Sequence, residues 1–151
     1  MASERITAAF ALSGEGRGTV LLLQEPLSFW GGLDACTGLI IDERHPQYGK
    51  SIAGSVLGMS TAKGSSSSSS VLAEAIRNGT GPVAIVMREA DLIVALGCIV
   101  ASELYAVDVP LVTLDEDAWN SFVVAADRGL SMATVTAAEA WSTVDVKTQP
   151  M

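Results

Sequence analysis

Six consecutive serines, Ser65 to Ser70, follow Lys63-Gly64 and lead into an apolar segment with helical features. The first N–H groups of a helix have no partner within it, and the helix dipole is positive there. A serine loop at such a point suits a bound carboxylate or phosphate, and it lowers the cost of ionising a serine hydroxyl. The sequence leaves three interpretations open: an anion-binding or active-site loop, a flexible serine linker, and a helix cap made by Ser69 or Ser70.

Other common arrangements of catalytic residues are missing from the sequence. The GxxxxGK spacing of a phosphate-binding loop does not occur around Lys63, and there is no GxSxG nucleophile elbow. The single histidine, His45, precedes Pro46 and therefore indicates a turn residue rather than a general base. A Ser-His-Asp triad is disfavoured for the same reason.

The two cysteines, Cys36 and Cys98, form no CxxC motif and no cluster with the histidine. This usage favours reduced thiols in a cytoplasmic protein over a disulfide or a metal site. The longest apolar run, Leu92 to Ala101, has ten residues and is too short to cross a bilayer. We therefore expect a cytoplasmic chain that has no membrane segment and no metal ligands of its own.

Length and composition predict one packed domain, residues 1–151. The chain has 151 residues, of which 49% are hydrophobic, and this is too apolar for a disordered protein. Its net charge of −8 repels phosphate backbones, so nucleic acid is not expected as a partner.

Short apolar segments and helical segments alternate along the chain, which predicts a mixed α/β domain with a β-rich first part. The Asn78-Gly79 pair is expected to end one helix, and Asp91 is expected to begin the next as its N-cap. The residues after Ala137 have little pattern, so 136–151 are expected to be a loosely packed tail. The expected strands are 18–23, 39–42, 52–59, 82–87, 109–115 and 131–137, and the expected helices are 71–79, 91–105 and 116–127.

Three stretches of the chain resemble a known family. They are Gly14–Leu57, with SFxGGxDxxTG followed by HPxxG, then Lys63–Gly79, which begins KGS, and Pro82–Leu104. Together they are similar to the small subunit, or swivelling domain, of the aconitase X family, and the likeness extends over roughly residues 14–112.

The resemblance implies a swivelling β/β/α fold and a hydro-lyase that is active only with a large subunit. That subunit, and not this chain, would hold the iron–sulfur cluster whose iron polarises the leaving hydroxyl. The substrate would be a small hydroxy acid, cis-3-hydroxy-L-proline in bacterial members or mevalonate 5-phosphate in archaeal ones, and we expect the former. A swivelling module that binds without catalysing remains the alternative.

The resemblance also assigns roles within the serine loop. The serine that follows Lys-Gly in the family is the proton acceptor, and here it is Ser65. Lys63, Gly64 and Ser66 would contact the substrate. In the Ser28–Asp34 loop, Phe29 and Trp30 are interpreted either as a local core or as a subunit contact, and Asp34 as a turn cap.

Overall fold

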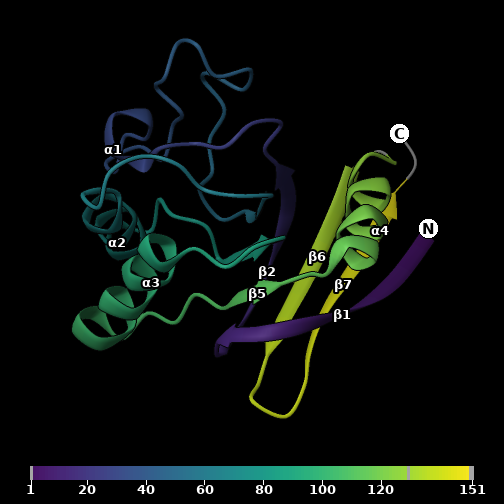
Figure 1. Cartoon of the computed structure of the whole chain (residues 1–151). Coiled ribbons are helices and arrows are strands. Elements are labelled where there is room, and N and C mark those ends of the chain that lie inside the picture. The colour runs from purple at the N-terminus through teal and green to yellow at the C-terminus, as the bar shows by residue number, and fades with distance from the viewer. Residues whose placement is uncertain (1, 129, 150–151) are drawn as a thin grey trace.

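The computed structural model describes residues 2–128 and 130–149 and shows a β-barrel flanked by helices (Figure 1). The strands are β1 (Ala2–Leu12), β2 (Gly14–Leu22), β3 (Val56–Met59), β4 (Ala84–Met87), β5 (Leu111–Thr113), β6 (Leu130–Ala137) and β7 (Ser142–Gln149). The helices are α1 (Phe29–Gly32), α2 (Ser68–Asn78), α3 (Leu92–Tyr105) and α4 (Glu116–Ala126).

The barrel closes in the order β1-β5-β4-β3-β2-β6-β7 and has two different halves. Strands β2, β3, β4 and β5 run parallel to one another, whereas β1, β6 and β7 pair antiparallel with their neighbours. Parallel strands need crossover connections, and here α2 joins β3 to β4 and α3 joins β4 to β5. The carboxyl ends of the parallel strands therefore meet at one edge, where α2 and α3 begin.

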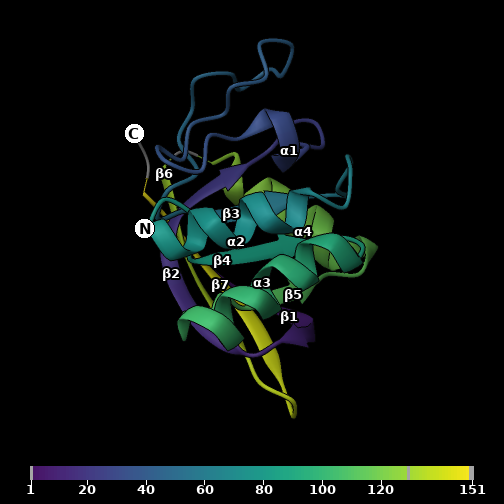
Figure 2. The same cartoon turned by 90° about the vertical axis from the view of Figure 1, so that its left-hand side faces the viewer.

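Two apolar cores lie on opposite faces of the parallel strands. Leu57, Ile85 and Leu111 alternate with Val56, Val86 and Val112 along these strands, and the two sets belong to different cores. The first set packs beneath α2 and α3, and the second packs with Phe122 and Trp119 of α4. Figure 1 shows α4 on the side opposite α2 and α3, and Figure 2 shows α2 and α3 in front of the strands. This layering is the expected mixed β/β/α fold.

Local signals in the sequence placed most helices well. The predicted helix stop at Asn78-Gly79 is confirmed, because α2 ends at Asn78 and Gly79 is its left-handed C-cap. Asp91 is the N-cap of α3, and its carboxylate accepts the N–H of Val94. The predicted helix at 116–127 corresponds to α4.

One predicted strand is absent, a second is shorter than expected, and the expected loose tail contains a strand. Residues 39–42 form only isolated bridges, of Leu39 with Ser51 and of Ile40 with Leu33, because their backbone groups bond within the loop. The strand predicted at 52–59 begins only at Val56, and the Gly54 before it lies in a turn with φ +69°. The tail is not loose where it is described: β7 is paired on both sides, with buried Val144 and Val146. Residues 150 and 151 lie outside the described residues.

Strand β1 was not predicted at all, although it pairs with both β5 and β7 and completes the barrel. No helix in the described part of the chain is both long and apolar enough to span a membrane.

Candidate functional site

The serine loop connects the carboxyl end of β3 to the start of α2, at the edge where the parallel strands end. In parallel sheets this edge is where ligands bind, because the loops there converge and helix N-termini point toward them. The residues just after β4 fix the start of this loop, since the N–H groups of Arg88 and Glu89 both donate to the carbonyl of Ser60 at 3.3 Å. The candidate site thus rests on rigid elements on both sides.

Gly64 sets the path of this loop. Its φ of +105° lies in the region that favours glycine, and its Cα faces the side chain of Ser28. A Cβ at this position would come within 2.7 Å of the Ser28 Cβ, and closer still to the Ser28 hydroxyl. Only glycine fits here, so the Lys63-Gly64-Ser65 turn requires its glycine for both conformation and space.

Ser65 is exposed, and its hydroxyl oxygen accepts the N–H of Ser67 at 3.2 Å. A donor aimed at this oxygen stabilises negative charge on it. The carbonyl of Ser65 accepts the N–H of Ser68 at 3.0 Å, so the turn leads directly into α2. The hydroxyl of Ser65 is therefore oriented by the first turn of the helix while remaining open to a reacting molecule.

We expected Ser69 or Ser70 to cap the helix, and this prediction was wrong. The N-cap is Ser67, and it makes no side-chain cap bond. Ser68 is buried and accepts the N–H of Trp30 at 3.0 Å, whereas the Ser69 hydroxyl donates to the carbonyl of Ile93 at 2.6 Å. These two serines join α2 to the Ser28–Asp34 loop and to α3. They do not cap α2, because the helix starts earlier than its apolar pattern indicated.

The other predicted site residues, Lys63 and Ser66, are also exposed. Lys63 lines an open cavity of about 340 Å³, together with Glu25, Asp42, Arg44 and His45. The carbonyl of Ser66 accepts the N–H of Ser69 at 3.2 Å. All four predicted residues thus belong to one exposed loop, and the cavity extends from its Lys63 side.

In the Ser28–Asp34 loop, the two aromatic side chains have different environments. Phe29 is 2% exposed and belongs to the core, whereas Trp30 is 59% exposed. Asp34 caps a turn as expected, because its carboxylate accepts the N–H of Cys36 at 2.9 Å. The contact of Ser28 with Gly64 was not predicted, because nothing in the sequence around these two small residues indicates that they meet.

His45 is a turn residue, as its place before Pro46 indicated. Its Nδ1 accepts the N–H of Gln47 at 3.0 Å, and its Nε2 lies 3.0 Å from the carbonyl oxygen of Glu25. Both ring nitrogens are therefore engaged with the backbone.

The described residues do not fit an iron–sulfur cluster. Nowhere in 2–128 or 130–149 do three or more His, Cys, Asp or Glu side chains come together as they would to hold a metal ion. Cys36 is exposed and Cys98 lies on the buried face of α3, and burial raises the pKa of the Cys98 thiol to about 12. A thiol in that state is a poor ligand because ligation needs the thiolate.

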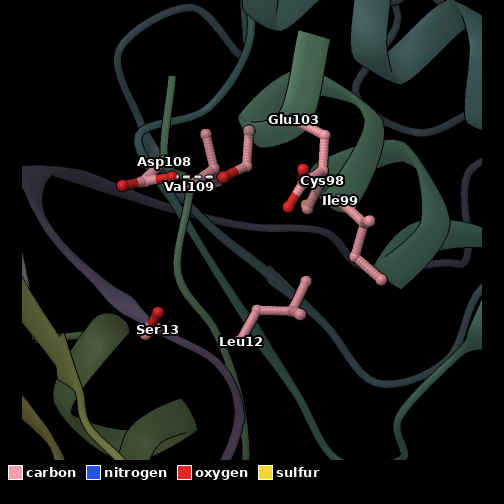
Figure 3. A pocket seen from close by; sticks show the side chains of 8 residues that line it. Leu12, Ser13, Cys98, Ile99, Glu103, Asp108 and Val109 are labelled. Carbon is pink, nitrogen blue, oxygen red and sulfur yellow. Dashed lines mark hydrogen bonds between the residues drawn. The ribbon is translucent and has the colours of Figure 1, made fainter. Parts of the chain in front are cut away.

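A separate cavity of about 190 Å³ lies at the opposite edge of the parallel strands (Figure 3). Leu12 and Ser13 border it from the turn before β2, and Asp108 and Val109 border it from the segment before β5. The hydroxyl of Ser102 donates to the carboxylate of Asp108 at 2.5 Å on its wall. This cavity is not part of the serine-loop site, because it lies at the amino ends of these strands.

A mixed barrel with helices on both sides, and a serine loop that opens onto a helix N-terminus, defines a swivelling domain of the aconitase type. The family model described as the aconitase X swivel domain matches residues 5–141. The chain belongs to this family, and the resemblance noted from its motifs is confirmed.

Named relatives carry two activities. The chain is 42% identical over 105 residues to a cis-3-hydroxy-L-proline dehydratase of Pseudomonas aeruginosa, and it spans 18% of that protein's length. It is 48% identical over 88 residues to a phosphomevalonate dehydratase small subunit of Methanothermobacter thermautotrophicus, of which it spans 67%. These matches cover 70% and 58% of this chain, respectively.

The fold has a solved counterpart. The crystal structure of Thermococcus kodakaraensis aconitase X in its holo-form superposes with a TM-score of 0.78 at 28% identity. The superposition covers 95% of this chain and 98% of that one. The barrel and its helices are thus shared along almost the whole chain.

Proposed function

We propose that this chain is the swivelling subunit of an iron–sulfur-dependent hydro-lyase that dehydrates cis-3-hydroxy-L-proline. The observation that carries the proposal is the exposed Ser65 hydroxyl, oriented by the N–H of Ser67 at the N-terminus of α2. Relatives named as dehydratases support the reaction class. We further propose that the chain is one domain and that it works in the cytoplasm, where free thiols such as Cys36 and Cys98 persist.

Ser65 acts as the base in this proposal. Dehydration removes a proton from carbon and expels hydroxide from the neighbouring carbon, so the proton must pass to a basic atom held against the substrate. The ionised Ser65 hydroxyl would receive it, while the Ser67 N–H, the helix dipole and the Lys63 ammonium reduce the cost of its negative charge. Ser66 and the backbone at Gly64 would hold the substrate beside it.

A large partner subunit completes the site. The described residues of this chain offer no metal centre that could activate the leaving hydroxyl, so we assign that role and the cluster to the partner. Two exposed apolar side chains border the serine loop, Trp30 at 59% and Leu92 at 83% exposure. The N–H of Trp30 donates to the Ser68 hydroxyl, and the carbonyl of Ile93, which follows Leu92, accepts the Ser69 hydroxyl. A subunit that covers Ser65 would therefore also cover these two side chains.

Mevalonate 5-phosphate is the second candidate substrate. The higher identity, 48%, is to a small subunit of phosphomevalonate dehydratase, which is also a chain of similar length. The exposed Lys63 beside an open cavity gives a place for a phosphate as well as for a carboxylate.

Both substrates can be tested in one experiment. The chain is purified alone and co-purified with the cluster-bearing subunit under anaerobic conditions, and each sample is offered cis-3-hydroxy-L-proline and mevalonate 5-phosphate. We expect the complex to dehydrate hydroxyproline and the chain alone to do nothing. If the complex turned over mevalonate 5-phosphate and not hydroxyproline, mevalonate 5-phosphate would become the assigned substrate. A stable complex that turns over neither compound would favour the non-catalytic binding module.

A further inference from the structure

We infer that His45 and Gln47 are positioning residues for the serine loop. They form a bracket, defined here as the four hydrogen bonds that these two side chains make, which fixes the segment between β2 and Ser28. The inference rests on the proposed function, because it assigns the HPxxG segment a role in placing Ser65.

Gln47 forms one half of the bracket. Its Nε2 donates to the carbonyl of Leu22 at 2.8 Å, and its Oε1 accepts the N–H of Gln24 at 3.0 Å. The amide thus pairs with the backbone on either side of Leu23, just as β2 ends. A side-chain amide that satisfies both a donor and an acceptor fixes the direction in which the chain leaves the barrel.

His45 forms the other half. Because its Nδ1 accepts the N–H of Gln47, the ring proton belongs on Nε2, which donates to the carbonyl of Glu25 at 3.0 Å. His45 is only 6% exposed, so these bonds are shielded from competing water. The two side chains therefore hold Gln24 and Glu25, and the His45 ring also binds the backbone N–H of Gln47.

The segment held by the bracket leads directly to the site. Leu27 is fully buried, and the next residue, Ser28, lies against the Cα of Gly64. Ser28 also donates to the carbonyl of Trp30, whose own N–H donates to Ser68. A shift of the 24–28 segment must therefore move Gly64, and Ser65 moves with it.

Two variants break the bracket in different places. In His45→Asn, the shorter side chain can still accept the N–H of Gln47, as asparagine does in turns, but it cannot reach Glu25. In Gln47→Glu, the shape is kept, but the oxygen that replaces Nε2 has no proton to give to Leu22. Thr80→Val is the matched control, because its hydroxyl bonds the Ala35 carbonyl at 2.6 Å and pins another loop, at the far end of α2.

The measurements are kcat for each purified complex, and amide hydrogen exchange of residues 60–70 in the chain alone. We expect both bracket variants to lower kcat by about tenfold or more, since small misplacements of a catalytic group are costly. Exchange in the serine loop should be faster in both. Thr80→Val should lower the melting temperature by a similar amount and leave kcat and loop exchange unchanged.

If the bracket variants lose stability as Thr80→Val does, but keep the wild-type kcat and loop exchange, the bracket is structural only and the inference is overturned. If His45→Asn does not fold, Gln47→Glu decides the question alone. If the wild-type complex has no dehydratase activity, the proposed function fails, and loop exchange then decides the bracket by itself: faster exchange supports it, and unchanged exchange refutes it.

Discussion

The Cα of Gly64 rests directly against the side chain of Ser28, where a methyl group would come within 2.7 Å of the serine Cβ. These two residues lie in different loops, after β3 and after β2, respectively. Their contact is one of the links between the serine loop and the rest of the strand edge, and it can be tested by adding the missing methyl group.

Gly64→Ala should destabilise the fold by about 1 kcal/mol for its positive φ alone, and by more because of the contact with Ser28. The matched control is Gly79→Ala, which has a φ of +76° and no atom within 4 Å of the added methyl group. The melting temperature of Gly64→Ala should therefore be lower than that of Gly79→Ala. Ser28→Gly added to Gly64→Ala should recover part of the difference, and no recovery would show that the contact is not the cause.

Ser65→Ala should lower kcat of the complex by at least about a hundredfold, which is the low end for loss of a positioned acid–base group. Its melting temperature should change little, because the side chain is exposed and makes one hydrogen bond, to Ser67. Ser70→Ala, an exposed position in the first turn of α2, is the control and should alter neither quantity. A Ser65→Ala complex with near-normal turnover would falsify the assignment of the base.

Ser69→Ala should cost about 1 kcal/mol of unfolding free energy through loss of the bond to Ile93, which links α2 to α3. For a chain of this size that corresponds to a fall of roughly 2–4 °C in melting temperature. Because Ser69 is buried and its hydroxyl is bonded to Ile93, kcat should fall much less than in Ser65→Ala. A melting temperature equal to that of Ser70→Ala would contradict this role.

Cys98 should be inert to thiol reagents in the folded chain. The thiolate is the reactive form, and a pKa of about 12 leaves almost none of it at pH 8. A colorimetric thiol titration at that pH should therefore count one thiol, from the exposed Cys36, and a second only after unfolding. Cys36→Ser should abolish the fast reaction, and fast labelling that survives in this variant would show that α3 does not protect Cys98.

Signals that act over a few residues were enough to predict α2, α3 and α4, but not the short α1, which lies in a segment expected to be a loop. The Asp91 cap and the Asn78-Gly79 stop satisfy backbone groups within their own helix, so their effect is visible in the sequence. The buried parallel strands β4 and β5 were found in the same way, as short apolar runs between turns.

Strand β1 was missed because both of its partners, β5 and β7, are far away along the chain. Strand β7 was missed although one of its partners, β6, directly precedes it. Ile6 pairs opposite Val144, and no local pattern reports a contact over that separation. The alternation of Val144 and Val146 with polar residues was a usable signal for β7. The same limit applies to the site: Ser65 was predicted from its motif, whereas the contact of Gly64 with Ser28 depends on two loops that only the barrel brings together.

The pairing of Ala2 with Thr148 places the start of β1 beside the end of β7. The chain thus enters β1 and leaves β7 at the same place on the barrel. The domain can therefore be fused to, or inserted into, a longer polypeptide without opening the barrel. Among the relatives, the matched segment is 18% of one protein and 67% of another. For an engineer, the paired ends mean that a linker at either terminus could join the chain to the large subunit that we propose as its partner.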